Sequence, residues 1–200
     1  MPTLVEAKTL IEAVEEAKNI LHTDKIYYTT EEKKGGLFKG KIYQVSAISY
    51  QELLEEMKNY LKDVIVELGL EVKFETSIND EIYNITMYSN NNSILIGKNG
   101  QTLKALETLL KAKINNDWHV HPKVVLDVEN YKEKRIRYLE RLALKVAKEV
   151  RETKTDAILE NMNSYERRII HNKLAKFKGV STVSEGEEPN RHIIIKAEDK

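Results

Sequence analysis

The sequence predicts an α+β protein made of three small domains, over residues 1–49, 50–130 and 131–200. Three observations predict this class. The chain has 200 residues, which exceeds the usual size of a single domain. Its apolar residues switch repeatedly between the spacing of an amphipathic helix and the alternation of a half-buried strand. Near the middle of the chain, a loop with two glycines separates a short apolar run from a longer amphipathic helix.

The first domain is predicted to be a βαββ unit. Thr9 and Glu12 have capping-box spacing at the start of its helix, and an apolar stripe follows at helical intervals. The predicted strands cover 3–6, 25–30 and 41–48, and the helix covers 10–21. The loop before the last strand carries two cations and two large apolar residues: Lys33, Lys34, Leu37 and Phe38. This loop is either a protein-contact site or a hairpin loop whose apolar residues fold back onto the core.

The second domain is predicted to have the order helix, strand, strand, helix, loop, helix, strand. The first helix ends at Gly69, because glycine readily adopts the conformation that closes a helix. A turn with Asn79 and Asp80 joins the two strands. The predicted ranges are helix 50–70, strands 70–77 and 81–89, helix 101–115 and strand 123–129.

The loop of this domain is Gly97-Lys98-Asn99-Gly100, directly after Ile96. Its glycines let the backbone approach another chain closely, and the free N–H groups at the start of the next helix favour phosphate. The element order with this loop between two helices resembles a type II KH domain, whose loop clamps about four single-stranded nucleotides. The predicted clamp is Ile96, Gly97, Lys98, Asn99 and Gly100, with Lys104 in the helix that follows. The alternative interpretation is a tight turn between two core elements.

The third domain is predicted to begin with a long basic helix over 130–153, followed by a strand over 155–160. Asn163 and Glu166 have capping-box spacing for a second helix, and strands over 180–184 and 191–197 complete the chain. Arg167 and His171 lie four residues apart, so they share one face of that helix. This pair suits phosphate binding, although a surface arginine beside a hydrogen-bonded histidine is an equally simple interpretation.

Charge is unevenly distributed, although the chain has 32 basic and 32 acidic residues. Residues 1–96 carry 10 Lys or Arg against 16 Asp or Glu, whereas residues 131–178 carry 14 against 7. A basic domain within a neutral chain is typical of nucleic-acid binding. The absence of cysteine excludes disulfides and thiolate metal sites and suits a reducing cytosol. We expect no secretory signal and no membrane span, because the required apolar segments are missing.

Two other function classes remain open at this stage. An enzyme would need a metal at His119 and His121 with Asp117 or Asp127, but the sequence contains no paired carboxylates, activated nucleophile or cofactor loop. We therefore predict no catalytic residue, no metal and no cofactor. A protein-interaction scaffold that dimerises through the KH fold is the second alternative, and single-stranded DNA is an alternative ligand to RNA.

The whole chain resembles the Jag (KhpB/EloR) family of bacterial RNA-binding proteins. The matching segments are residues 33–40, the loop 97–100, and residues 162–171 with 184–191. The resemblance implies a nucleic-acid site at Arg167, Arg168, His171 and Arg191 in the third domain. Two departures are an extra glycine with Lys39 in the first segment, and His192 where a second arginine is common.

The same resemblance implies a cytoplasmic RNA chaperone or post-transcriptional regulator with a role in cell elongation, division, cell shape and cell-wall organisation. It also implies three kinds of partner besides single-stranded RNA. These are a smaller KH-domain protein, a membrane-protein insertase and the division machinery. A homodimer is a further possibility for the KH surface.

Overall fold

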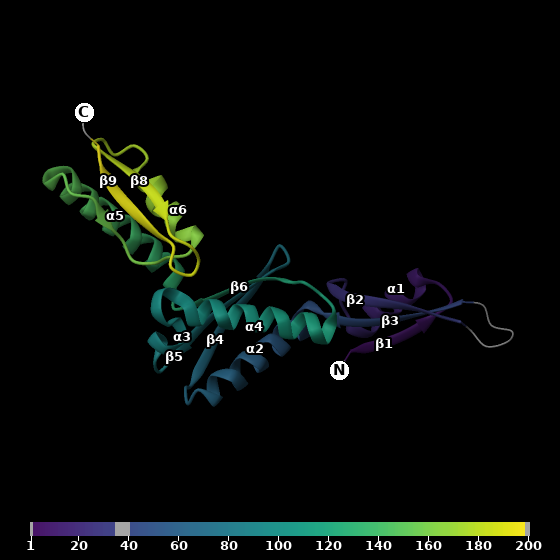
Figure 1. Cartoon of the computed structure of the whole chain (residues 1–200). Helices are drawn as coiled ribbons and strands as arrows, with labels where there is room; N and C mark the ends of the chain where they lie inside the picture. Colours follow the sequence, from purple (N-terminus) through teal and green to yellow (C-terminus); the bar gives the residue numbers. More distant parts are fainter. Residues whose placement is uncertain (1, 35–40, 199–200) are drawn as a thin grey trace. The chain divides into compact units, whose positions relative to one another are not determined.

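The computed structural model describes residues 2–34 and 41–198. The chain divides into two compact units, residues 1–129 and 130–200. The described residues form three three-stranded sheets, and one sheet falls in each of the three predicted domains. Figure 1 shows the helices that accompany each sheet. The predicted α+β class is thus confirmed, whereas the predicted domain boundaries stay a prediction.

The N-terminal sheet has the strand order β1-β3-β2, and both pairings are antiparallel. Its elements are β1 (Thr3–Ala7), α1 (Leu10–Leu21), β2 (Ile26–Lys34) and β3 (Lys41–Ser49). Helix α1 covers one face of the sheet, where Ala13 and Ala17 pack against Val5, Val45 and Ala47. The small alanine side chains let the helix approach the sheet closely.

The prediction of a loop from residue 31 to residue 40 was wrong in its first part. Strand β2 continues to Lys34, and the Lys33 Nζ atom lies 3.2 Å from the Glu6 carboxylate. The alternating sequence of the strand was obscured by its run of charged residues, which the long antiparallel pairing with β3 accommodates. Leu37 and Phe38 lie outside the described residues. The cap at Thr9 is confirmed by its hydroxyl, which accepts from the Glu12 backbone N at 3.2 Å.

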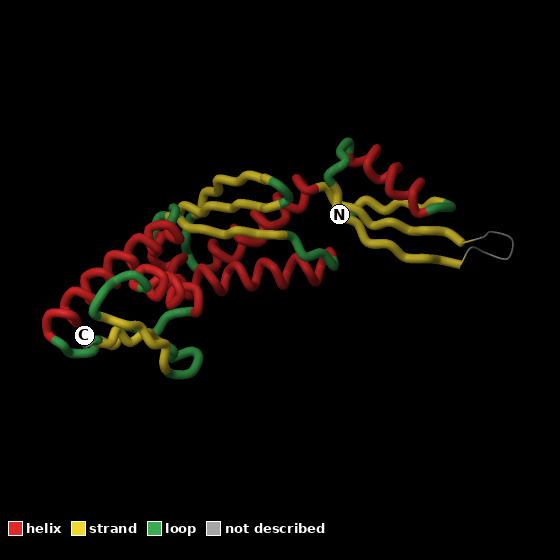
Figure 2. Tube along the Cα trace, turned by 90° about the horizontal axis from the view of Figure 1, so that it is seen from above, coloured by secondary structure: helices red, strands yellow, loops and turns green. Residues whose placement is uncertain are grey.

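The second sheet has the order β4-β5-β6, with β4 antiparallel and β6 parallel to β5. Its unit contains α2 (Tyr50–Glu67), β4 (Val72–Asn79), β5 (Ile82–Ser89), α3 (Asn92–Ile96), η1 (Lys98–Gly100), α4 (Gln101–Trp118) and β6 (Lys123–Val128). This is the predicted αββααβ order. The helices cover one face of the sheet (Figure 2), where Tyr83, Ile85 and Met87 of β5 are buried. Ser49 ends β3 and also caps α2 with a complete capping box to Glu52.

The C-terminal unit packs two helices against a sheet of order β7-β9-β8. Its elements are α5 (Tyr131–Thr153), β7 (Ala157–Ile158), α6 (Ser164–Leu174), β8 (Val180–Glu185) and β9 (His192–Ala197). Its core includes Leu139, Ala143, Ile170, Ile193 and Ile195. The strand predicted over 155–160 is shorter than expected, because only Ala157 and Ile158 pair with β9.

Candidate nucleic-acid interface

The loop between α3 and α4 owes its shape to three residues with positive φ angles. Gly97 has φ 69° and ψ −178°, Asn99 has φ 51° and ψ 30°, and Gly100 has φ 77° and ψ 15°. Glycine is required at position 97, because a Cβ atom there would lie 2.1 Å from the Thr102 Oγ1 atom. Asparagine is one of the few residues other than glycine that tolerates the left-handed conformation of position 99. The loop sequence therefore encodes one particular backbone path.

This path leads into the N-terminus of α4, an 18-residue helix. Gly100 occupies the N-cap position and no side chain caps the helix, so its first N–H groups are available to an anion. The Lys98 and Lys104 side chains are exposed and form no ion pair within the described part of the chain. Ile96 and Asn99 are half-buried. The structure thus brings the predicted clamp residues together in one short segment beside a helix N-terminus.

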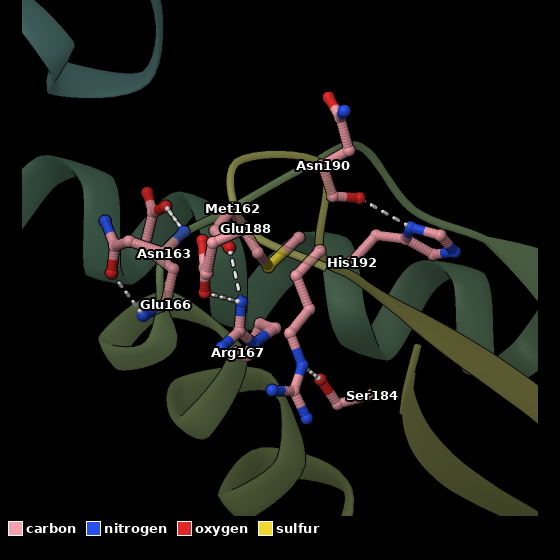
Figure 3. Close-up of polar contacts among 9 residues, drawn as sticks. Met162, Asn163, Glu166, Arg167, Ser184, Glu188, Asn190 and His192 are labelled. Atoms are coloured by element: carbon pink, nitrogen blue, oxygen red, sulfur yellow. Dashed lines mark hydrogen bonds and ion pairs between the residues drawn. The ribbon is translucent and has the colours of Figure 1, made fainter. Parts of the chain in front are cut away.

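The second candidate site lies around the start of α6 (Figure 3). Arg167 is only 8% exposed. Its Nη1 atom donates to the Met162 carbonyl oxygen at 3.0 Å and to the Glu188 carboxylate at 2.8 Å. A guanidinium so buried and so engaged presents little of itself to a ligand. Arg168, the next residue, is exposed and has no ion pair among the described residues.

His171 and Arg191 are both exposed, and both contact strand β8. The His171 Nδ1 atom lies 2.7 Å from the Thr182 hydroxyl, and the Arg191 Nε atom donates to the Ser184 hydroxyl at 3.1 Å. Thr182 and Ser184 are two residues apart in one strand, so their side chains lie on the same face of the sheet. Two cationic or polar groups are thereby held along one strand, an arrangement suited to the oxygens of phosphate.

The predicted capping box at the start of α6 is confirmed. The Asn163 side chain accepts from the Glu166 backbone N, and the Glu166 carboxylate accepts from the Asn163 backbone N (Figure 3). The same carboxylate, although only 4% exposed, also accepts from Arg135 of α5 at 2.8 Å. This network fixes the turn that carries Arg167 and His171.

Sequence reasoning missed the residues that support this site. They are Arg135, Thr182, Ser184 and Glu188, and each contacts a predicted site or capping residue that is distant in sequence. The sequence signal that could have found Glu188 was the acidic loop before Arg191, which is unusual beside a basic site. His192, noted as a departure, points its Nδ1 atom at the Asn190 carbonyl oxygen at 3.0 Å.

The histidines considered for a metal site occupy a different environment from the one an enzyme would need. His119 closes α4 with φ 53°, and β6 begins only at Lys123, so neither His119 nor His121 lies in a strand. Within residues 2–34 and 41–198, no group of three His, Cys, Asp or Glu side chains could hold a metal ion. No helix in the same ranges is both long and apolar enough to cross a membrane.

The fold and the two sites define a class of protein in which a type II KH domain precedes an Arg-x-x-x-His domain. Comparison with family models agrees. Residues 52–128 match the KH domain of KhpA/KhpB, and residues 137–197 match the domain that is named after its Arg-x-x-x-His motif. Both are binding domains, which confirms the prediction that the chain is not an enzyme.

Three relatives show the particular family. The RNA-binding protein KhpB of Clostridium symbiosum is 38% identical over 198 residues, covering 96% of this chain and 89% of the relative. KhpB of Bacillus subtilis is 36% identical over 183 residues, covering 88% and 87%. KhpB of Lactiplantibacillus plantarum is 36% identical over 137 residues, covering 68% and 42%. The chain belongs to the KhpB (Jag) family, as the sequence resemblance predicted.

Proposed function

We propose that this chain is a cytoplasmic protein that binds single-stranded RNA and acts as an RNA chaperone or post-transcriptional regulator. The observation that carries the proposal is the backbone of residues 97–100. Its three positive φ angles lead into an uncapped helix N-terminus, next to the exposed Lys98. A loop of this form accepts the phosphates of a single strand, whereas a simple turn has no need of exposed N–H groups.

The Arg-x-x-x-His domain supplies the second contact in this proposal. Its exposed Arg168, His171 and Arg191 are suited to phosphate oxygens, and histidine also stacks on bases. Two weak sites on one chain bind a common strand more tightly than either alone, because the second contact is intramolecular. Names of the relatives support RNA as the ligand, and single-stranded DNA is the alternative that competition experiments separate.

The cellular role that we propose is a link to cell elongation, division and cell shape. It would operate through a smaller KH-domain protein, a membrane-protein insertase or the division machinery. The loop with Lys33, Lys34, Leu37 and Phe38 is the proposed protein contact. Homodimerisation through the KH surface is a further proposal, and light scattering across a range of protein concentrations tests it directly.

The proposed function is tested by fluorescence anisotropy with a short labelled single-stranded RNA at two salt concentrations. The double variant Lys98→Asp/Asn99→Asp places two carboxylates in the clamp, and we expect it to weaken binding at least about tenfold by repelling phosphate. Aspartate tolerates the left-handed conformation of residue 99, so the loop keeps its shape. A chain that binds no RNA at low salt, or whose affinity ignores salt, would contradict the proposal.

A further inference from the structure

The buried position of Arg167 conflicts with a role in direct contact with phosphate. Its guanidinium is 8% exposed and already bonded to the Met162 carbonyl and the Glu188 carboxylate. A phosphate could take this place only by displacing Glu188. Separating a largely buried charge from its partner is costly, and the gain from the phosphate would have to exceed that cost.

The partner of Arg167 belongs to a short loop, residues 186–190, which joins β8 to β9. The loop is tight: the Asn190 backbone N donates to the Glu187 carbonyl at 2.7 Å, and a Cβ atom on Gly186 would lie 3.1 Å from the Asn190 carbonyl oxygen. The segment around the start of α6 holds this loop and its end at three points. They are Arg167 on Glu188, Asn161 on Asn190 at 3.1 Å, and the Met162 backbone N on the Arg191 carbonyl at 3.1 Å.

The loop leads directly into Arg191, whose side chain is exposed and contacts the Ser184 hydroxyl. The backbone position of Arg191 therefore depends on how firmly the loop before it is held. Figure 3 shows Arg167 and Glu188 joined by their ion pair within this group of residues. Removing the pair would free the loop at its middle point while the two other contacts remain.

We infer that Arg167 and Glu188 form a clasp that positions Arg191 for RNA, and that Arg167 itself does not contact the ligand. This inference rests on the proposed function. It assigns direct contact to Arg191, His171 and Arg168, and it makes Glu188 a carboxylate that assists the binding of a polyanion. Glu188 remains 60% exposed at its side chain, so it can be substituted without creating a cavity.

The inference predicts an effect with a sign opposite to that of simple electrostatics. Glu188→Gln removes a negative charge near a phosphate site, which by itself would raise RNA affinity. If the pair is a clasp, the same substitution loosens the loop, and RNA affinity falls roughly fivefold because a charge-assisted contact is lost.

Glu187→Gln is the matched control. It removes the same charge one residue earlier, and the Glu187 side chain has no hydrogen bond or ion pair among the described residues. We expect its RNA affinity to stay unchanged or to rise by up to about twofold. Thermal unfolding of both variants establishes that the domain remains folded.

Two readouts separate positioning from general damage to the domain. The slope of log K against log salt should fall by about 0.7 in Glu188→Gln, the amount expected for one lost phosphate contact on a single strand. In an Arg191→Ala background, Glu188→Gln should have almost no further effect, because the group that it positions is gone.

Equal or higher affinity of Glu188→Gln relative to the unmodified chain would overturn the inference and support a competitor role for Glu188. Independent, additive effects of Glu188→Gln and Arg191→Ala would also overturn it. Both outcomes leave the proposed function intact, since that function fails only if the unmodified chain does not bind RNA.

Discussion

The two candidate sites expose different parts of the chain to a ligand. The KH loop presents backbone, shaped by the positive φ angles of Gly97, Asn99 and Gly100. The Arg-x-x-x-His site presents side chains, and hydrogen bonds from elsewhere in the domain hold them in place. The KH site should therefore be most sensitive to an added Cβ atom, and the Arg-x-x-x-His site most sensitive to the loss of a supporting polar group.

The largest expected effect is that of Gly97→Ala, which tests the backbone half of this comparison. The added Cβ would lie 2.1 Å from the Thr102 Oγ1 atom, at a φ angle of 69°. The loop must change its path, so we expect RNA affinity to fall more than about tenfold and stability to fall by about 1–3 kcal/mol. Anisotropy and thermal unfolding measure the two quantities.

Gly69→Ala is the control for backbone strain. Gly69 has a φ angle of 75°, and a Cβ atom there would meet nothing within 4 Å. We expect about 1 kcal/mol of destabilisation with RNA affinity unchanged. If both alanine variants lose the same small amount of affinity, the loop path is not what the ligand recognises.

An intermediate effect is expected for Thr182→Val, which tests the side-chain half. Valine keeps the shape of threonine but removes the hydroxyl that lies 2.7 Å from the His171 Nδ1 atom. Freed from this bond, the imidazole samples more orientations, and RNA affinity should fall by roughly threefold. Ser181→Ala on the opposite face of β8 is the control, and its affinity in the same assay should match that of the unmodified chain.

The smallest effect on binding is expected for Thr9→Ala, which sharpens the comparison from outside both sites. Its hydroxyl caps α1 by accepting from the Glu12 backbone N at 3.2 Å. Loss of this cap should cost about 1 kcal/mol of stability in chemical denaturation. RNA affinity should not change, and a clear decrease would indicate that the N-terminal domain takes part in binding.

The elements and the KH loop could be predicted well from the sequence because they depend on local patterns. The alternation in β5, the helical stripe of α4 and the glycines of the loop are all visible within a few residues. The capping box of α6 likewise involves residues only three apart. Local chemistry of this kind survives folding when the tertiary structure agrees with it.

The supports of the Arg-x-x-x-His site could not be predicted in the same way. Arg135 and Glu166 are separated by 31 residues, and Arg167 and Glu188 by 21. Such pairs form only when the sheet and the two helices pack, and no local spacing encodes them. The burial of Arg167 follows from the same packing, so its motif alone identified it as a phosphate ligand.

The central claim is that both domains bind one RNA strand. The most direct measurement is anisotropy of one labelled single-stranded RNA with Gly97→Ala, with Arg191→Ala and with the double variant, each verified as folded. The account predicts that each single variant retains the weaker affinity of the remaining site and that the double variant loses binding. A double variant that binds as tightly as either single variant would contradict the account.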